Sequence, residues 1–355
     1  MKKLYAIIVL LCLSCTSAFV YSQGARANKG TVLHLKLHGK SLEGNLDGDS
    51  TDRNITVYLP ASYKTSLKRH YPVVYFLHGF TDNDSKWYGL TKHWINLPAI
   101  LDTVFASGKA KEMIFVTADA DTRFRGSMYS NSITTGNWEG FVALEMVAYM
   151  DTHYRTIAKA SSRGLAGHSM GGYGTMRIGE RYPLVFSSIY MLSPASLSPF
   201  TETFSPEQMN RMEAIKTISD FNKADFGTKY TFASLAAWAP DVSNPPLYLD
   251  LPFKDGKPLP AIQAKIIANA PLATLDQYIA NLKTLHAIGF DAGDKDIPGI
   301  AASIKVLDSE LTKYGIKHSF EVYPGTHTSN IAQRLVLKVL PFFSDNLVFS
   351  DYNSK

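Results

Sequence analysis

The chain has 355 residues, of which 45% are hydrophobic and 19% are charged, and its formal net charge is +5. This length is enough for one large domain or two ordinary ones, and the composition is that of a globular protein rather than a disordered one. The basic residues are scattered and form no run suited to a phosphate backbone, so nucleic acid is not expected as a partner.

The N-terminal segment has the features of a secretory signal peptide. Two lysines precede an apolar run of ten residues, Leu4 to Leu13, which is too short to span a bilayer. The residues before position 23 favour cleavage after Ser22. We therefore expect residues 1–22 to be removed and residues 23–355 to form a single exported domain, periplasmic or extracellular.

Both cysteines, Cys12 and Cys15, lie in this segment. The exported domain is therefore expected to contain neither thiols nor disulfides. Lipid attachment at Cys15 is an alternative, because the residues before it resemble a lipoprotein cleavage site. The usual aliphatic residue three positions earlier is replaced by Cys12, so removal of the whole segment is the favoured interpretation.

The predicted strands are of two types. The first two, residues 31–38 and 53–60, alternate polar and apolar side chains, as half-exposed edge strands do. The later ones are continuous apolar runs, the pattern of strands buried on both faces of a parallel sheet. These runs are residues 71–79, 112–119, 161–169, 186–194 and 317–325.

Segments with helical spacing separate these strands, at residues 138–154, 170–182 and 331–343. Such alternation indicates an α/β fold, with a mostly parallel sheet and helices on both faces. Residues 196–285 break the pattern, with helical pieces and a proline-rich stretch. A gap of this length is long for simple crossovers. We expect a helical cap over the catalytic face; the alternative is ordinary crossover helices with one long loop.

The sequence AGHSMGGYG, residues 166–174, contains Gly-x-Ser-x-Gly with Ser169 at its centre. A predicted strand ends at Ser169 and a predicted helix follows, which is the context of a nucleophile elbow. So tight a turn requires small residues at Gly167 and Gly171, and the helix N-terminus favours a nearby oxyanion. A structural glycine turn would not need the serine, so we expect Ser169 to be a nucleophile.

A serine nucleophile needs a histidine base, which follows it along the chain in this type of fold. His327 lies in a loop between a strand and the last helix, where a base is expected. His318 lies within a predicted strand, and His286 precedes one at the wrong end for the active face. His327 is therefore the predicted base.

The base needs an orienting carboxylate. Residues 288–296, a predicted strand and the loop that follows it, offer three aspartates. Asp291 is still within the predicted strand, whereas Asp296 lies deeper in the loop. Asp296 is the predicted acid and Asp294 is the alternative. The remaining carboxylates are expected to be solvated or to cap a helix.

An oxyanion hole needs two backbone N–H groups. Met170 follows the nucleophile and is expected to provide one. Phe80 is expected to provide the other, since Gly79 lets the loop after residues 71–79 turn toward the site. His78 is expected to brace this loop through hydrogen bonds rather than act on substrate.

The segment from Asp121 to Phe141 follows a strand that we expect beside the nucleophile strand, so its loop is predicted to border the pocket. Polar and aromatic groups there could orient a substrate; the alternative is a surface loop with a buried tryptophan at the helix start. The candidates are Ser127, Tyr129, Asn131, Trp138 and Glu139. Sugar stacking is considered for Trp87, Trp94 and Trp238, but we expect core positions for these tryptophans.

Five segments occur in the order and spacing of a known family: RNITVYLPASY, YPVVYFLHGF, AGHSMGGYGTMR, FDAGDKD and YPGTHTS. In these the chain resembles the putative esterase family of α/β-hydrolases, which is similar to S-formylglutathione hydrolases, feruloyl and acetyl-xylan esterases and mycolyltransferases. The resemblance covers roughly residues 33–343 except the inserted region. It implies a Ser169–His327–Asp296 triad and oxyanion donors at Phe80 and Met170.

The sequence has no zinc-protease HExxH and none of the glycine-rich phosphate or dinucleotide loops, so no metal and no cofactor is expected. These features together predict a secreted serine carboxylesterase acting on short-chain or carbohydrate-linked esters of the acetyl or feruloyl type. The alternatives are an acyltransferase of the same fold, or a non-catalytic carbohydrate-binding protein. The oligomeric state is left open.

Overall fold

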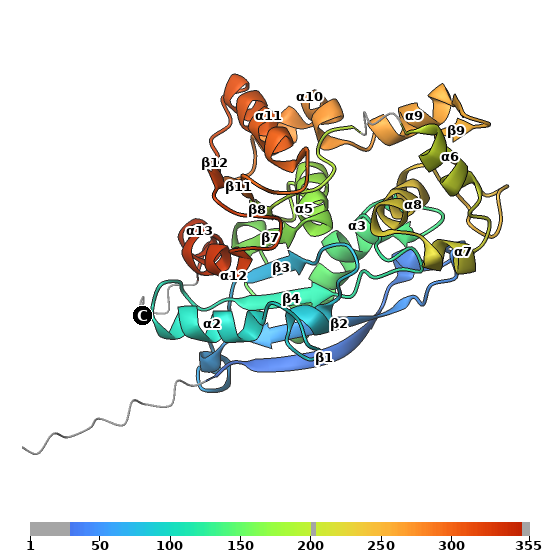
Figure 1. Cartoon of the computed structure of the whole chain (residues 1–355). Helices are drawn as coiled ribbons and strands as arrows, with labels where there is room; N and C mark the ends of the chain where they lie inside the picture. Colours follow the sequence, from blue (N-terminus) through green and yellow to red (C-terminus); the bar gives the residue numbers. More distant parts are fainter. Residues whose placement is uncertain (1–28, 200–203, 350–355) are drawn as a thin grey trace, which may run out of the picture.

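An eight-stranded sheet runs through the middle of the protein (Figure 1). The computed structural model describes residues 29–199 and 204–349, so the predicted signal segment and both cysteines lie outside the described residues. The strand order is β1-β2-β4-β3-β7-β8-β11-β12. The bounds are β1 (Thr31–His38), β2 (Asp52–Leu59), β3 (Val73–Leu77), β4 (Ile114–Ala118), β7 (Arg163–His168), β8 (Ser188–Leu192), β11 (Ala287–Gly293) and β12 (Ser319–Tyr323).

The sheet is mostly parallel, as the sequence predicts. β2 pairs antiparallel with β1 and with β4, whereas the other neighbouring strands pair parallel. β3, β4 and β8 are buried over their whole length, and β1 is partly exposed. Four of the five continuous apolar runs form interior strands of the sheet. The fifth, residues 317–325, contains the edge strand β12, which is only partly buried, contrary to expectation. Of the two alternating runs, residues 31–38 form the edge strand β1, whereas residues 53–60 do not form an edge, because β2 pairs with both β1 and β4 and is mostly buried.

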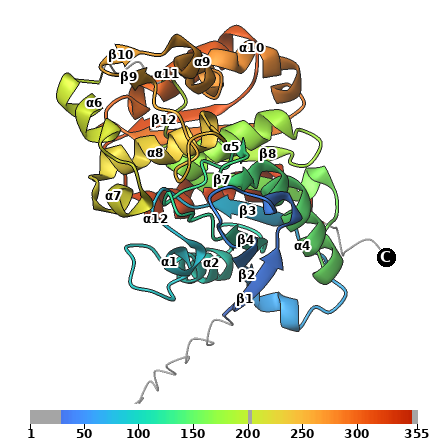
Figure 2. The same cartoon turned by 90° about the vertical axis from the view of Figure 1, so that its right-hand side faces the viewer.

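Helices cover both faces of the sheet (Figures 1 and 2). Successive side chains of a strand point to opposite faces, so Val73 and Tyr75 of β3 lie in one core and Val74 and Phe76 in the other. The first core includes α3 (Trp138–Gly140), α4 (Val147–His153), α5 (Met170–Arg181), α10 (Pro271–Leu282) and α11 (Ile300–Lys313). The second includes α1 (Asp84–Trp87), α2 (Leu97–Ala106), α12 (Ile331–Arg334) and α13 (Leu340–Asn346).

The chain between β8 and β11 carries an insertion. α10 packs against α5 and leads into β11, so it is the crossover helix that precedes this strand. The inserted part precedes α10 in the chain and is shorter than the predicted 196–285 segment. Figure 1 shows its helices grouped away from α2 and α13. It comprises α6 (Pro206–Glu213), α7 (Ile218–Lys223), α8 (Phe226–Trp238), the hairpin β9 (Phe253–Lys254) and β10 (Lys257–Pro258), and α9 (Pro260–Ile267).

One expectation about neighbouring strands is wrong. The segment from Asp121 to Phe141 follows β4, but β3 lies between β4 and β7 in the sheet. The loop therefore begins one strand further from Ser169 than expected from the sequence. It contains the small hairpin of β5 (Asn131–Ser132) and β6 (Gly136–Asn137), and α8 of the insertion packs against it.

Candidate active site

Ser169 lies in a sharp turn between β7 and α5. Its backbone has φ 59° and ψ −116°, a conformation that costs free energy for a residue with a side chain. A Cβ on Gly167 would lie 2.3 Å from the carbonyl oxygen of Gly171, and a Cβ on Gly171 would lie 2.0 Å from that of Leu77. Both positions therefore require glycine, as predicted, and the turn presents Ser169 at the carboxyl edge of the sheet.

Three predicted side chains meet at this edge. His327 Nε2 lies 2.8 Å from Ser169 Oγ, and His327 Nδ1 lies 2.6 Å from Asp296 Oδ1. His327 comes from the loop after β12 and Asp296 from the loop after β11. The carboxyl ends of parallel strands share one edge of a sheet, which explains why residues up to 158 positions apart are hydrogen-bonded in series.

The electrostatics of Asp296 suit a carboxylate that orients a histidine. Its side chain is fully buried, and burial by itself favours the protonated form. The hydrogen bond and positive charge of His327 outweigh burial, so the pKa of Asp296 lies below its ordinary value. An ionised Asp296 accepts a hydrogen bond from the Nδ1–H of His327, and Nε2 is then left as an acceptor facing the Ser169 hydroxyl.

The other two carboxylates have different partners. Asp294 Oδ1 accepts the Gly325 N–H at 2.9 Å and so ties the acid loop to the loop that carries His327. Asp291 is buried in β11, where Arg334 Nε and Nη2 donate to its Oδ2 at 2.9 and 2.7 Å. The geometry therefore places Asp296, rather than its neighbours, beside the histidine.

The Asp291–Arg334 pair provides a stability prediction. Arg334→Met should lower the free energy of unfolding by about 3–5 kcal/mol, because it leaves the Asp291 carboxylate buried without its counter-charge. The matched control is Lys338→Met, which removes an exposed contact of 2.8 Å to Glu321 and should cost less than about 1 kcal/mol. Urea unfolding followed by circular dichroism measures both. Equal losses in the two variants would contradict the prediction.

The remaining candidate histidines lie away from Ser169. His318 Nε2 is 2.8 Å from Asp308 Oδ1, and its ring stacks on Phe290. The His286 N–H donates to the Ser187 carbonyl at the amino-terminal end of β11. Neither histidine lies beside Ser169, as expected from its position in the sequence.

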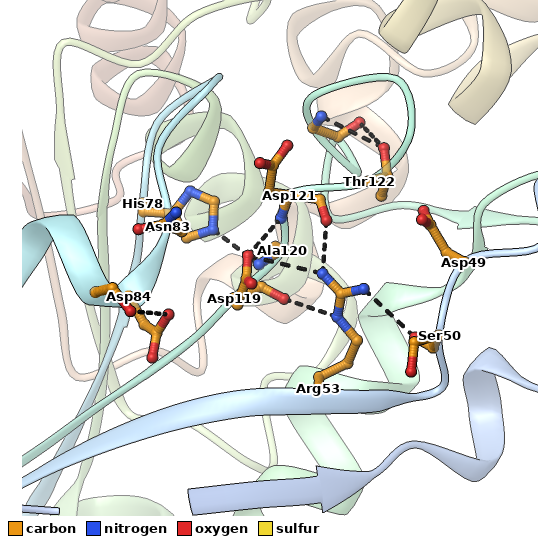
Figure 3. A network of polar contacts seen from close by, with 12 residues as sticks. Asp49, Ser50, Arg53, His78, Asn83, Asp84, Asp119, Ala120, Asp121 and Thr122 are labelled. Carbon is orange, nitrogen blue, oxygen red and sulfur yellow. Dashed lines mark hydrogen bonds and ion pairs between the residues drawn. The ribbon is translucent and has the colours of Figure 1, made fainter. Parts of the chain in front are cut away.

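His78 braces the loop after β3, as predicted (Figure 3). The Ala120 N–H donates to His78 Nε2 at 2.8 Å, so Nδ1 carries the hydrogen and donates to the Gly79 carbonyl at 2.8 Å. The ring thereby joins the loops after β3 and β4. A Cβ on Gly79 would lie 3.4 Å from Ser169 Cβ, which places this loop directly against the nucleophile turn.

The two predicted oxyanion donors are Met170, which follows Ser169 in the chain, and Phe80, in the loop after β3 that lies against the nucleophile turn. Met170 is the first residue of α5, so its N–H has no acceptor within the helix. The Phe80 N–H takes part in none of the turn and loop hydrogen bonds formed by the described residues. The Phe80 ring packs edge-on against Phe226 and Tyr230 of α8, so the insertion contacts the loop that carries this amide.

Arg53 was not singled out from the sequence, yet it organises the same region (Figure 3). It donates to the carbonyl oxygens of Asp119 at 3.0 Å and Asp121 at 2.6 Å. It thus holds the chain just after β4, where His78 also binds. Because the acceptors are backbone carbonyls of the segment just after β4, residue type and spacing carry no signal for this contact.

The predicted substrate-binding side chains are mostly buried. Ser127, Tyr129, Trp138 and Glu139 are all at most 5% exposed. The Tyr129 hydroxyl donates to the His78 carbonyl at 3.1 Å, and Ser127 Oγ accepts the Tyr129 N–H at 3.1 Å. Tyr129 therefore contacts the loop after β3 that carries Phe80, and the burial of all four residues does not support direct contact with substrate.

The helix-start residues of this segment are structural as well. Trp138 Nε1 donates to the Thr135 carbonyl, and Glu139 forms an ion pair of 2.6 Å with Arg177. The buried-anchor alternative for Trp138 is therefore the one that the structure favours. Asn131 is exposed, and its N–H donates to Glu139; of the five candidates it alone presents a side chain to solvent.

The tryptophans divide into two groups. Trp87 and Trp238 are buried, as expected for core residues. Trp94 is 45% exposed, contrary to that expectation, and its ring lies 5.9 Å from that of His168. Within residues 29–199 and 204–349, no group of three or more His, Cys, Asp or Glu side chains is placed to hold a metal ion.

The chain is similar in sequence to curated proteins named as esterases. An esterase of Mycobacterium tuberculosis is 27% identical over 286 residues, 77% of this chain and 52% of the relative. An endo-1,4-beta-xylanase/feruloyl esterase of Xylanibacter ruminicola is 31% identical over 189 residues, 51% of this chain and 24% of the relative. The chain thus spans about half, or less, of the length of these curated relatives.

A solved structure of a ferulic acid esterase superposes with a TM-score of 0.62 at 22% identity, covering 90% of this chain and 99% of that one. The similarity shows that the protein has the α/β-hydrolase fold expected from its sequence. The family model described as "Putative esterase" matches residues 50–334. Since that match spans most of the chain and includes the Ser169 turn and the loops of Asp296 and His327, the chain belongs to this esterase family.

Proposed function

We propose that the protein is a serine carboxylesterase that acts through an acyl-enzyme intermediate. The observation that carries this proposal is the series of hydrogen bonds from Asp296 through His327 to Ser169. This arrangement can raise the nucleophilicity of a serine hydroxyl, which is otherwise weak. The family match and the relatives named as esterases support the same chemistry.

The reaction follows from the positions of these groups. His327 Nε2 accepts the proton of Ser169 as Oγ attacks the ester carbonyl carbon, and the carbonyl π electrons move to the oxygen. The N–H groups of Phe80 and Met170 donate to this oxyanion. Its collapse expels the alcohol, which takes the proton from His327. A water molecule, deprotonated by His327, then attacks the acyl-serine carbonyl carbon. As the bond between that carbon and Ser169 Oγ breaks, His327 returns the proton to Oγ, which releases the carboxylic acid and restores Ser169.

We propose carbohydrate-linked esters of the acetyl or feruloyl type as substrates, and export of the protein as the route to them. The relative from Xylanibacter ruminicola, whose name joins a xylanase to a feruloyl esterase, supports the substrate class. The signal-like N-terminal segment supports export. In the part of the chain that the structure describes, no helix is long and apolar enough to cross a membrane.

The test uses the protein without residues 1–22. It is incubated with p-nitrophenyl acetate, butyrate and octanoate, with methyl ferulate and with acetylated xylan, and the released acid is measured. Mass spectrometry of the quenched reaction should find the acyl group on the peptide that contains Ser169. Hydrolysis with this adduct is the expected result. Failure on every ester, or an adduct on another residue, would overturn the proposal.

A further inference from the structure

His168 precedes the nucleophile and is buried beside the histidine of the proposed triad. Its side chain is 3% exposed, and its ring lies 4.8 Å from the ring of His327. The rings of Trp87 and Trp94 lie 6.0 and 5.9 Å away. Three aromatic side chains therefore surround His168, and little space remains for its ring to turn.

A single hydrogen bond joins His168 to the main chain of His327. His168 Nε2 lies 2.9 Å from the His327 carbonyl oxygen, across 159 positions of the sequence. A carbonyl only accepts, so Nε2 carries the hydrogen and Nδ1 is unprotonated in the neutral ring. Nδ1 is buried and has no hydrogen-bond partner among the described residues. The orientation of the ring is thus decided by its bond to His327.

The His327 ring is held by Asp296 and Ser169, but the main chain of its loop, apart from the bond from His168, is held mainly through exposed groups. Pro324, Thr326 and Thr328 are exposed. The Gly325 N–H donates to the Asp294 carboxylate, and the Gly325 carbonyl accepts the Lys295 N–H. Both contacts come from the acid loop, which is itself at the surface. The bond from His168 differs, because it connects the peptide of His327 to β7, the buried strand that ends at Ser169.

The charge state of His168 suits a permanent donor beside a histidine that gains and loses a proton. Burial, and then the positive charge that His327 acquires, lower the pKa of His168 to about 4. His168 therefore stays neutral at neutral pH while His327 is protonated during the reaction. A lysine or arginine here would donate the same hydrogen bond but would place a second positive charge against the imidazolium.

We infer that His168 is a positioning residue for ester hydrolysis: its Nε2–H holds the carbonyl of His327, and this keeps the imidazole within hydrogen-bond distance of Ser169. The inference rests on the proposed function, because it assigns His168 a role only through His327. It concerns the turnover step rather than substrate affinity. Loss of the donor should therefore lower kcat and leave KM nearly unchanged.

The experiment compares His168→Phe, which keeps a ring but has no donor, with His168→Gln, whose amide can donate. We expect kcat to fall about 10-fold in the Phe variant, as for loss of one hydrogen bond in a buried site, with KM changed less than about 2-fold. The Gln variant should stay within about 3-fold of the parent. Labelling of Ser169 by a fluorophosphonate should slow in parallel with kcat.

His318→Gln is the matched control, because it removes a buried histidine that is bonded to Asp308, away from the triad. Its kcat should equal that of the parent even if its unfolding temperature falls. Should the Phe variant fail to fold, His168→Asn, whose shorter side chain cannot reach the carbonyl, replaces it. Parental kcat in the Phe or Asn variant, or equal losses in the Phe and Gln variants, would overturn the inference. Activity in Ser169→Ala would instead overturn the proposed function.

Discussion

Ser169→Ala should lower kcat for p-nitrophenyl butyrate by about 10⁶-fold, the scale of loss when a serine nucleophile is removed from an intact triad. The variant loses the only atom that would bond to the acyl carbon. Alanine fits the space of the serine side chain, so the turn and the Phe80 and Met170 amides should persist. Substrate binding should accordingly change little, and the loss should appear in kcat.

The control for this variant is Ser187→Ala. Ser187 precedes β8 at the opposite end of the sheet, where its hydroxyl lies near that of Ser188. Both variants should unfold cooperatively at temperatures close to that of the parent. If Ser169→Ala hydrolysed the ester as fast as Ser187→Ala, Ser169 would not be the nucleophile and the proposed mechanism would be wrong.

The second large effect is expected at Asp296. Asp296→Asn should lower kcat by about 10⁴-fold, because the amide can donate to Nδ1 and stabilise the tautomer whose Nε2 carries the hydrogen. Such a ring cannot accept the Ser169 proton. The variant also removes the charge that stabilises protonated His327. Steady-state hydrolysis of p-nitrophenyl butyrate at neutral pH measures the effect.

Asp294→Asn provides the comparison within the same loop. Its amide oxygen can still accept the Gly325 N–H, which Asp294 Oδ1 accepts at 2.9 Å, so kcat should remain within about 10-fold of the parent. Similar large losses in both variants would mean that the loop, rather than one carboxylate, orients His327. Because the pKa of Asp296 is below its ordinary value of 3.8, protonation of this carboxylate should not limit activity between about pH 5 and 8.

The insertion contacts the loops that border the proposed site. α8 packs Phe226 and Tyr230 against the ring of Phe80, and Trp238 Nε1 donates to Ser130 Oγ in the loop after β4. α8 thus contacts both the loop after β3 and the loop after β4, which His78 joins. Phe226 remains 59% exposed beside the proposed oxyanion donor. We therefore expect substitutions in α8 to change substrate preference.

The features that could be predicted from sequence depend on short stretches of chain. Continuous apolar runs identify buried parallel strands, and glycines two residues either side of Ser169 identify a turn that admits no other side chain. The position of His327 after a late strand follows from the same alternation. Each of these signals arises from backbone sterics or burial within a few residues. The structure agrees with them, except that the apolar run at residues 317–325 forms the partly exposed edge strand β12.

Other features arise only when distant segments pack together. The backbone of the acid loop decides which of Asp291, Asp294 and Asp296 reaches the histidine, and a shift of two residues would select another carboxylate. The order β4-β3-β7 separates the 121–141 segment from the nucleophile strand, and four of its five candidate side chains are buried rather than presented to a substrate. The bond from His168 to His327 likewise joins the end of β7 to the loop after β12, and these two strands are not neighbours in the sheet. Hydrogen bonds and burial between segments depend on strand order and loop path, which local periodicity does not specify.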